Sequence, residues 1–203
     1  VAGLQIPHGL GVAPFLVMGM SNDASGRYKA AWSRRLAQTS AAAYFSVNIN
    51  SVSGASATVW DSSAPDAANV TVGTNDATNI DGAGYALWCW SDISIYREVG
   101  FLGNGATDGV LEDIDGTPIS IPIWKDCSAL YGVVSVFDLL TPINPVDACL
   151  IVSDRISELA VASTLIIISN GYKLISNIDG WNASSHLIVG TAVIGNGKYR
   201  NAF

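Results

Sequence analysis

The chain has 203 residues, of which 49% are hydrophobic and only 13% are charged. A disordered chain lacks this much apolar material, so the chain must fold around a buried core. Ten Lys and Arg face 17 Asp and Glu, and the net charge of −7 has the wrong sign for a surface that binds nucleic acid. No apolar stretch reaches the roughly 18 residues that a membrane-spanning helix needs, so membrane insertion is not expected.

The low charge also bears on assembly. A surface with so few ions must be covered by small polar and apolar side chains. Interfaces between permanent subunits are apolar and poor in charge at their centres. The composition therefore favours a subunit of an assembly, such as a homo-oligomer, over a free monomer.

The first half of the chain reads mainly as short strands. An apolar run at Phe15–Met18 follows a Gly and Pro turn region and predicts a strand. Dense alanine over Ala30–Ala43 predicts one short helix. Tyr85–Trp90 is apolar at every position, so both of its faces should be buried, which predicts a central strand.

The second half also predicts short strands and one short helix. Ile119–Trp124 predicts a strand, and Ser153 is a candidate N-cap for a short helix over Asp154–Ala162. Leu165–Ile168 and Tyr172–Ile175 flank an Asn-Gly dipeptide and predict a hairpin.

The two halves resemble one another. Asn79–Gly82 and Asn177–Gly180 have the same four residues, Asn-Ile-Asp-Gly, and each is followed by an apolar run. Asp and Gly in that order are typical of a turn. A Gly and Pro turn before an apolar run also recurs at Pro14 and Pro118. The prediction is an all-β fold of two tandem sandwich-like units, 1–102 and 103–203, that arose by internal duplication and contain at most short helices.

Few residues suit catalysis or metal binding. Cys89, Cys127 and Cys149 form no Cys-x-x-Cys motif, and we interpret them as three buried thiols, with one disulfide and a free thiol as the alternative. His8 and His186 are the only histidines. No catalytic motif surrounds them, so we interpret His8 as a turn residue and His186 as a strand-end residue, and predict no catalytic residue, metal or cofactor.

One acidic segment needs a separate test. Glu112, Asp113 and Asp115 cluster before Gly116 and suggest either a calcium loop or a pair of catalytic acids. Their spacing does not match a twelve-residue calcium loop. We interpret the segment as an acidic turn between strands.

Two tryptophans lie in polar surroundings. Trp60 precedes Asp-Ser-Ser, and Trp181 lies between Gly180 and Asn182. An exposed indole ring stacks on sugars or anchors an interface, so both are candidate binding residues. The alternative is that each ring folds back over the end of the sandwich as part of the core.

Four segments together resemble a known family. They are Ile6–Pro14 (IPHGLGVAP), Phe101–Gly109 (FLGNGATDG), Ser169–Leu174 (SNGYKL) and the closing pair Asn182–Ser184 and Lys198–Ala202 (NAS and KYRNA). In this order they resemble a domain of tailed-bacteriophage virion proteins, described as tail fibre or structural proteins.

That resemblance implies a non-enzymatic structural protein of the virion, assembled in the bacterial host cytoplasm. It would serve as an exterior fibre, a decoration or a receptor-contact subunit, at the tail or at the head. Its expected partners are copies of itself and other virion proteins, with a host cell-surface glycan as a further candidate. Many copies on one particle would turn weak contacts into durable attachment. The alternatives are a carbohydrate-binding β-sandwich module and a glycan-degrading enzyme.

Overall fold

A computed structural model of the chain describes residues 2–21, 29–48, 53–92, 95–115, 117–128, 134–138, 146–151, 159–168, 170–175 and 182–195. Within them lie fifteen strands and two helices of four residues each, so the fold is all-β, as predicted. The helices are α1 (Arg34–Ala37) and α2 (Ala57–Trp60). A Ser side chain caps the N-terminus of each helix, Ser33 for α1 and Ser56 for α2.

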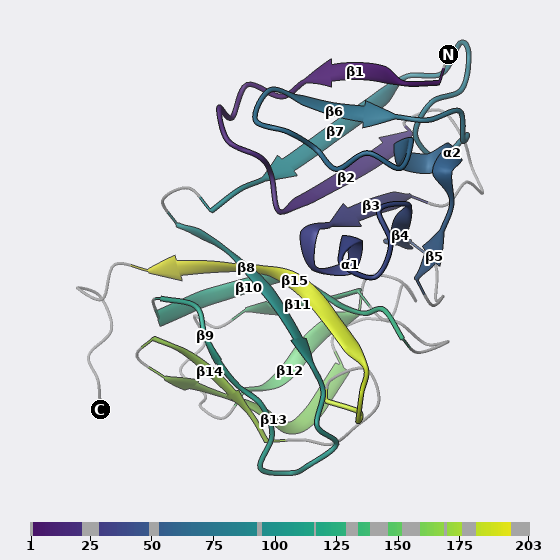
Figure 1. The fold of residues 1–203 in the computed structure, drawn as a ribbon. Helices are drawn as coiled ribbons and strands as arrows, with labels where there is room; N and C mark the ends of the chain where they lie inside the picture. Colours follow the sequence, from purple (N-terminus) through teal and green to yellow (C-terminus); the bar gives the residue numbers. More distant parts are fainter. Residues whose placement is uncertain are drawn as a thin grey trace.

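The strands form three sheets (Figure 1). The first half contributes β1 (Leu4–Pro7), β2 (Leu16–Ser21), β3 (Ala30–Ser33), β4 (Ala43–Ser46), β5 (Gly54–Ala55), β6 (Asn69–Val72) and β7 (Tyr85–Trp90). The second half contributes β8 (Tyr96–Leu102), β9 (Leu111–Asp113), β10 (Thr117–Asp126), β11 (Val134–Asp138), β12 (Val146–Ile151), β13 (Leu159–Ile168), β14 (Gly171–Leu174) and β15 (Leu187–Gly195).

A five-stranded sheet, ordered β5-β4-β3-β2-β7, is the middle layer of the molecule. Side chains alternate between the faces of a strand, so Val17 of β2 faces one way and its neighbours Leu16 and Met18 face the other. Both sets are buried. This explains why β2 is apolar from Leu16 to Met20: each face of the sheet is covered by another layer.

The small sheet of β1 and β6, together with α2, covers one face of the middle layer. The core on this side, here called the outer core, comprises Val17, Ala30, Trp32, Val59, Trp60, Val70, Val72 and Ala77.

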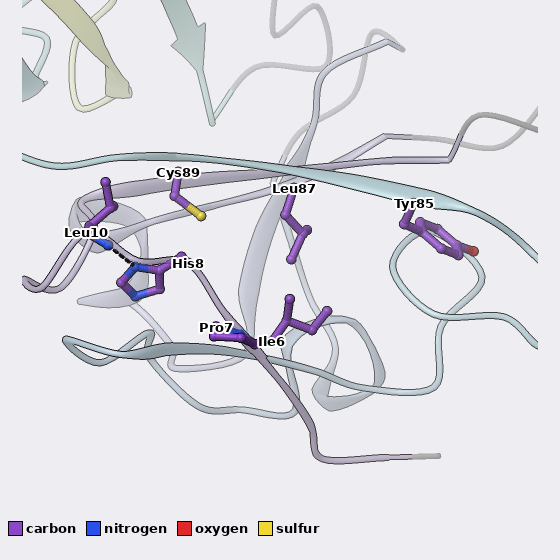
Figure 2. A pocket seen from close by; sticks show the side chains of 7 residues that line it. All are labelled: Ile6, Pro7, His8, Leu10, Tyr85, Leu87 and Cys89. Carbon is purple, nitrogen blue, oxygen red and sulfur yellow. Dashed lines mark hydrogen bonds between the residues drawn. The ribbon is translucent and has the colours of Figure 1, made fainter.

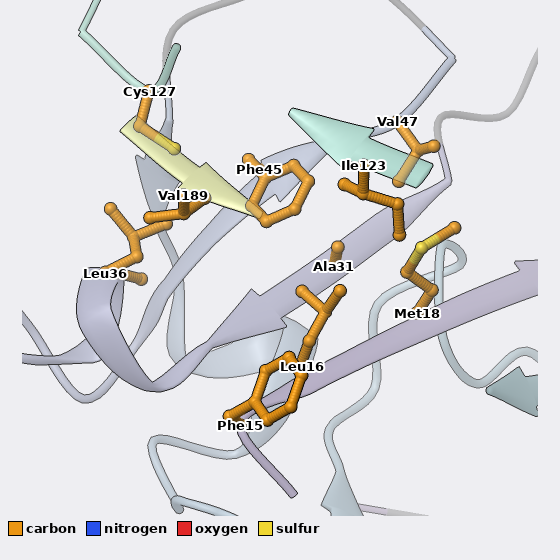
Figure 3. Close-up of a cluster of buried hydrophobic side chains, with 11 residues drawn as sticks. Phe15, Leu16, Met18, Ala31, Leu36, Phe45, Val47, Ile123, Cys127 and Val189 are labelled. Atoms are coloured by element: carbon orange, nitrogen blue, oxygen red, sulfur yellow. The ribbon is translucent and has the colours of Figure 1, made fainter. Parts of the chain in front are cut away.

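The eight-stranded sheet covers the other face. The core between them, here called the inter-sheet core, comprises Phe15, Leu16, Met18, Ala31, Leu36, Ala43, Phe45, Val47, Ile123, Cys127 and Val189 (Figure 3). Because Ile123, Cys127 and Val189 come from the second half of the chain, the two halves share this core.

The strand pairings of the first half recur in the second. In the first half β2 pairs with β3 and β7, β3 with β4, β4 with β5, and β1 with β6. In the second half β10 pairs with β11 and β15, β11 with β12, β12 with β13, and β9 with β14. All of these pairings are antiparallel. The same connectivity therefore appears twice along the chain, in the same order.

The second half differs in two respects. β13 also pairs with β14, whereas β5 and β6 do not pair among the described residues, and one strand, β8, is added. The eight-stranded sheet is ordered β8-β15-β10-β11-β12-β13-β14-β9, so β8 lies outside β15. The predicted first unit, 1–102, includes residues 96–102, but these residues pair with residues 187–193 of the second half. The change from one sheet to the other therefore falls between β7 and β8.

The eight-stranded sheet curls so that its ends approach each other (Figure 1). The Gly100 N–H of β8 donates a hydrogen bond to the Glu112 carboxylate of β9. Inside the curl, the Trp124 ring packs edge to face against Phe101 and Tyr172, with ring centroids 5.5 and 5.8 Å apart.

Two of the predicted turns lie within the described residues. The hairpin at residues 165–175 is confirmed, with Leu165 opposite Leu174 and Ile168 opposite Gly171. The Asn79–Gly82 turn is confirmed, with Gly82 at φ 76°. Its second copy, Asn177–Gly180, lies outside the described residues.

The helix predictions were largely wrong. Ala30–Ala43 contains only the single turn of α1, because Ala30–Ser33 is a buried strand that pairs with β2 and β4. In the segment Asp154–Ala162, residues 159–162 belong to β13 and the rest lies outside the described residues.

The prediction of a central strand at Tyr85–Trp90 was also wrong. β7 is a strand, but it is the last one in its sheet, and Trp88 is 49% exposed. The apolar pattern that suggests two covered faces thus belongs to an edge strand.

Candidate functional site

A pocket of about 350 Å³ lies between β1 and β7 (Figure 2). One wall is formed by β1 and the residues that follow it, and the other wall by alternate residues of β7. The lining residues are Ile6, Pro7, His8, Leu10, Tyr85, Leu87 and Cys89. Ile6 and Leu87 point toward each other from the two walls (Figure 2). This space is the candidate binding site of the molecule, and we call it the β1/β7 groove.

His8 is bonded at both ring nitrogens. The Leu10 N–H donates to His8 Nδ1 at 3.2 Å, so Nδ1 must be the unprotonated nitrogen. Nε2 then carries the hydrogen and donates to the Asp66 carbonyl oxygen at 3.1 Å. Both positions serve the fold, which confirms the interpretation of His8 as a turn residue.

The other polar lining residues are also engaged or unreactive. The Tyr85 hydroxyl donates to the Asp76 carbonyl oxygen at 2.6 Å. Burial raises the pKa of the Cys89 thiol, which keeps it protonated and weakly nucleophilic. The groove therefore offers contacts for binding rather than reactive groups.

The structure contradicts the proposed surface role of Trp60. Its side chain is 1% exposed and belongs to the outer core. The α2 turn, closed by Asp61 in the left-handed conformation, directs the ring inward. The ring lies over Gly19, where a Cβ atom would be in ordinary contact with Trp60 Cη2 at 3.4 Å. Trp60 therefore cannot stack on a ligand; Trp181, the second candidate, lies outside the described residues.

The acidic segment is structural where it is described. Glu112 and Asp113 are adjacent on β9, so their side chains point to opposite sides. Asp113 accepts hydrogen bonds from the Asp115 N–H and from Asn170 Nδ2, both at 2.9 Å. Asp115 is in the left-handed conformation with φ 53°. This fits the predicted acidic turn. Because their side chains point to opposite sides of β9, Glu112 and Asp113 do not form a pair of catalytic acids.

His186 takes part in a network that the sequence did not predict. Its Nδ1 lies 2.8 Å from Oδ2 of Asp126, a fully buried carboxylate at the end of β10. Asp126 Oδ1 accepts from the Ser128 N–H, and Ser128 Oγ accepts from the Leu187 N–H. The network fixes the start of β15 beside the end of β10, so His186 is a strand-end residue as predicted. Because Asp126 is 60 residues away in sequence, no local pattern indicates that it pairs with His186.

A second unpredicted cluster joins the two halves. Arg34 of α1 donates from Nε and Nη2 to Glu98 Oε2 of β8, at 3.0 and 2.6 Å, and from Nη2 to Asp92 at 2.8 Å. The Arg35 side chain lies against Gly100, where a Cβ atom would be only 2.5 Å from Arg35 Cγ. Burial raises the pKa of Glu98 despite the opposing hydrogen bonds from Arg34. In the sequence, the only indication of this cluster is a pair of adjacent arginines in a charge-poor chain.

The thiols are partly as predicted. Cys127 is buried and Cys89 is half-buried, and both are free. The side chain of Cys149 lies outside the described part.

Two kinds of feature are absent from the described residues. They contain no group of three or more His, Cys, Asp or Glu side chains that could hold a metal ion. Nor do they include a helix with the length and apolar character needed to cross a membrane.

The protein is all-β, and the same order of strand pairings occurs in both of its halves. The model of one family, described as a domain of unknown function (DUF7483), matches residues 1–192, so the chain belongs to that family. No curated protein and no solved structure matches the chain.

Proposed function

We propose that this chain is a non-enzymatic structural subunit of a bacteriophage virion, on the particle exterior as a fibre, decoration or receptor-contact protein. The proposal includes a tandem duplication as the origin of the repeated strand pairings. It also includes contacts with copies of itself and with other virion proteins.

The observation that carries the proposal is the position of the exposed apolar side chains. Among the described residues, most of the large exposed ones lie on strands at the ends of sheets: Leu4, Trp88, Tyr96, Leu102 and Leu111. Leu102 and Leu111 are 63% and 62% exposed. Large apolar side chains that stay exposed favour association with further chains. This supports a subunit whose exposed apolar side chains are covered in an assembly.

The polar groups support a structural role as well. Both histidines and the acidic pair Glu112 and Asp113 hold turns or strand ends, as described above. The resemblance of the turn motifs to virion proteins supplies the particular setting. For the carbohydrate-binding alternative, the burial of Trp60 removes one of the two residues that favoured it.

The first test is the native mass of the full chain at low micromolar concentration, by light scattering after size exclusion. We expect a trimer or a larger closed ring. Leu102→Glu should reduce this mass because it places a charge at an exposed apolar position. Thr107→Glu adds the same charge in an exposed loop and should leave the mass unchanged. A wild-type monomer of 21.2 kDa would contradict self-assembly.

The virion setting needs its own test. An antibody raised against the chain should label the outside of phage particles released by bacteria that carry its gene, as seen by immunogold electron microscopy. Detection only in the soluble part of the lysate, with bare particles, would overturn the virion assignment.

A further inference from the structure

No described strand pairs with the outer edge of β7, whereas its counterpart in the second half has such a partner. β7 pairs with β2, and β15 pairs in the same way with β10. On its other side, β15 pairs with β8 along seven residues, from Leu187 opposite Leu102 to Val193 opposite Tyr96. Among the described strands, β7 has no such neighbour.

In the second half, β8 fills the space between β15 and β9. It is hydrogen-bonded to β15, and its Gly100 N–H reaches the Glu112 carboxylate of β9. Val99 and Phe101 are 0% and 8% exposed, and the Phe101 ring packs against Trp124. One extended segment thus closes the curl and completes the core.

In the first half, the equivalent space is the β1/β7 groove. β7 corresponds to β15 and β1 corresponds to β9, as the repeated pairings show. The groove lies between these two strands, and Ile6 and Leu87 face each other across it (Figure 2). The pocket is therefore located where the equivalent of β8 would lie.

The edge of β7 is suited to accept a strand. The sequence of β7 is YALWCW, with no charge and no proline. Charged residues, proline and bulges are the usual protection of an exposed edge against pairing. Leu87 and Cys89 are half-buried and already line the groove, so an added strand would cover them.

We propose that the β1/β7 groove binds an extended peptide segment from outside these 203 residues, which pairs antiparallel with β7. The segment supplies main-chain hydrogen bonds to the β7 edge and places alternate apolar side chains into the groove, as Val99 and Phe101 of β8 do in the second half. A single strand fits the geometry because β1 forms the opposite wall, as β9 does for β8. This inference does not depend on the virion role.

The probe is a labelled synthetic peptide with the sequence of residues 95–103, IYREVGFLG, because β8 is the strand that completes the equivalent space. Fluorescence anisotropy with the full chain should show saturable binding. The same peptide with proline at the position of Val99 cannot donate a main-chain hydrogen bond there, so its affinity should fall at least about tenfold.

Two protein variants locate the binding. Leu87→Glu puts a charge into the groove and should weaken binding of the peptide at least about tenfold. Leu111→Glu puts the same charge on an exposed position of β9 and should change the affinity by less than about twofold.

A second readout needs no variant and holds even if Leu87→Glu fails to fold. Cys89 lines the groove, so bound wild-type peptide should slow its modification by a maleimide, measured residue by residue by mass spectrometry. The proline peptide should give much weaker protection.

Three results would overturn the proposal. The first is no saturable binding of the wild-type peptide up to about 1 mM. The second is equal affinity for wild type and a folded Leu87→Glu variant. The third is protection of Cys89 that grows with protein concentration alone and disappears in Leu87→Glu, which would make a second copy of the chain the occupant. None of these results bears on whether an antibody labels phage particles.

Discussion

Gly100 on β8 and Glu112 on β9 are joined by a hydrogen bond from backbone N–H to carboxylate, across the two ends of the eight-stranded sheet. This bond has no counterpart among the described residues of the first half, where Ile6 and Leu87 face each other across the β1/β7 groove. The two halves share most of their strand pairings, but only in the second half does a described strand close the curl.

The Glu112 carboxylate should make stability depend on pH. Burial raises its pKa above the ordinary value of 4.5, against the opposing hydrogen bond from the Gly100 N–H. The folded state therefore binds the proton more tightly than the unfolded state. The stabilisation from this group is complete below pH 4.5 and is lost as the pH rises through the folded-state pKa.

Glu112→Gln removes this titration. The free energy of unfolding of the variant minus that of wild type, from urea denaturation, should rise as the pH is increased from about 4 to about 7. A difference that is constant, or that falls over this range, would contradict the raised pKa. Taking the difference cancels the contributions of all other titrating groups that the substitution leaves unchanged.

Gly73 should tolerate no side chain. A Cβ atom there would lie 2.1 Å from the Thr58 carbonyl oxygen, and this backbone atom cannot move without displacing α2. Gly73→Ala should lower the free energy of unfolding by about 1–3 kcal/mol, the usual cost of overpacking. Urea denaturation followed by circular dichroism measures this.

Gly19→Ala is the matched control for Gly73→Ala. Its Cβ atom would meet side-chain atoms at 3.4 Å or more, which is ordinary contact. It should therefore cost much less than Gly73→Ala. If the two substitutions proved equal, the close approach of α2 to the end of β6 would be wrong.

Much of the strand pattern could be predicted from the sequence. Alternation and turn residues located the hairpin at 165–175 and the strand at Tyr85–Trp90. Whether a strand is central or at an edge depends on which other strands pair with it, and this is not encoded in its own residues. The uniform apolar character of β7 therefore led to the wrong position in the sheet.

The candidate site was harder to predict than the fold. In the sequence Trp60 stands beside polar residues, but its ring is buried among residues distant in the chain, such as Val17 and Ala30. Asp126 and His186, and Arg34 and Glu98, are likewise pairs that only the folded topology brings together. The β1/β7 groove is a gap between strands, and a gap has no sequence signature.

Trp60 should be among the most sensitive positions in the core. Its side chain is 1% exposed and packs among the residues of the outer core. Trp60→Ala should cost about 3–5 kcal/mol of stability, through lost burial and the cavity left behind. Trp88→Ala, at a position 49% exposed, should cost far less in the same denaturation experiment. The reverse order would place the Trp60 ring at the surface and restore it as a candidate ligand-binding residue.

Cys127 and Cys89 should differ in their reaction with a maleimide. Cys127 is fully buried in the inter-sheet core, and burial raises its pKa to about 12. Its thiol is therefore both inaccessible and protonated at neutral pH, so it should react only when the molecule unfolds. Cys89 lies in the β1/β7 groove and should react in the folded state, slowly, because burial also raises its pKa.

Mass spectrometry after timed labelling separates the two sites. Increasing urea below the unfolding midpoint should accelerate modification of Cys127 much more than that of Cys89, because only Cys127 requires opening of the inter-sheet core. Cys89→Ser should remove the native-state reaction at this site and leave the urea dependence of Cys127 unchanged. If Cys127 reacted in the folded state as fast as Cys89, the two halves of the chain would not share the closed core that Ile123, Cys127 and Val189 complete.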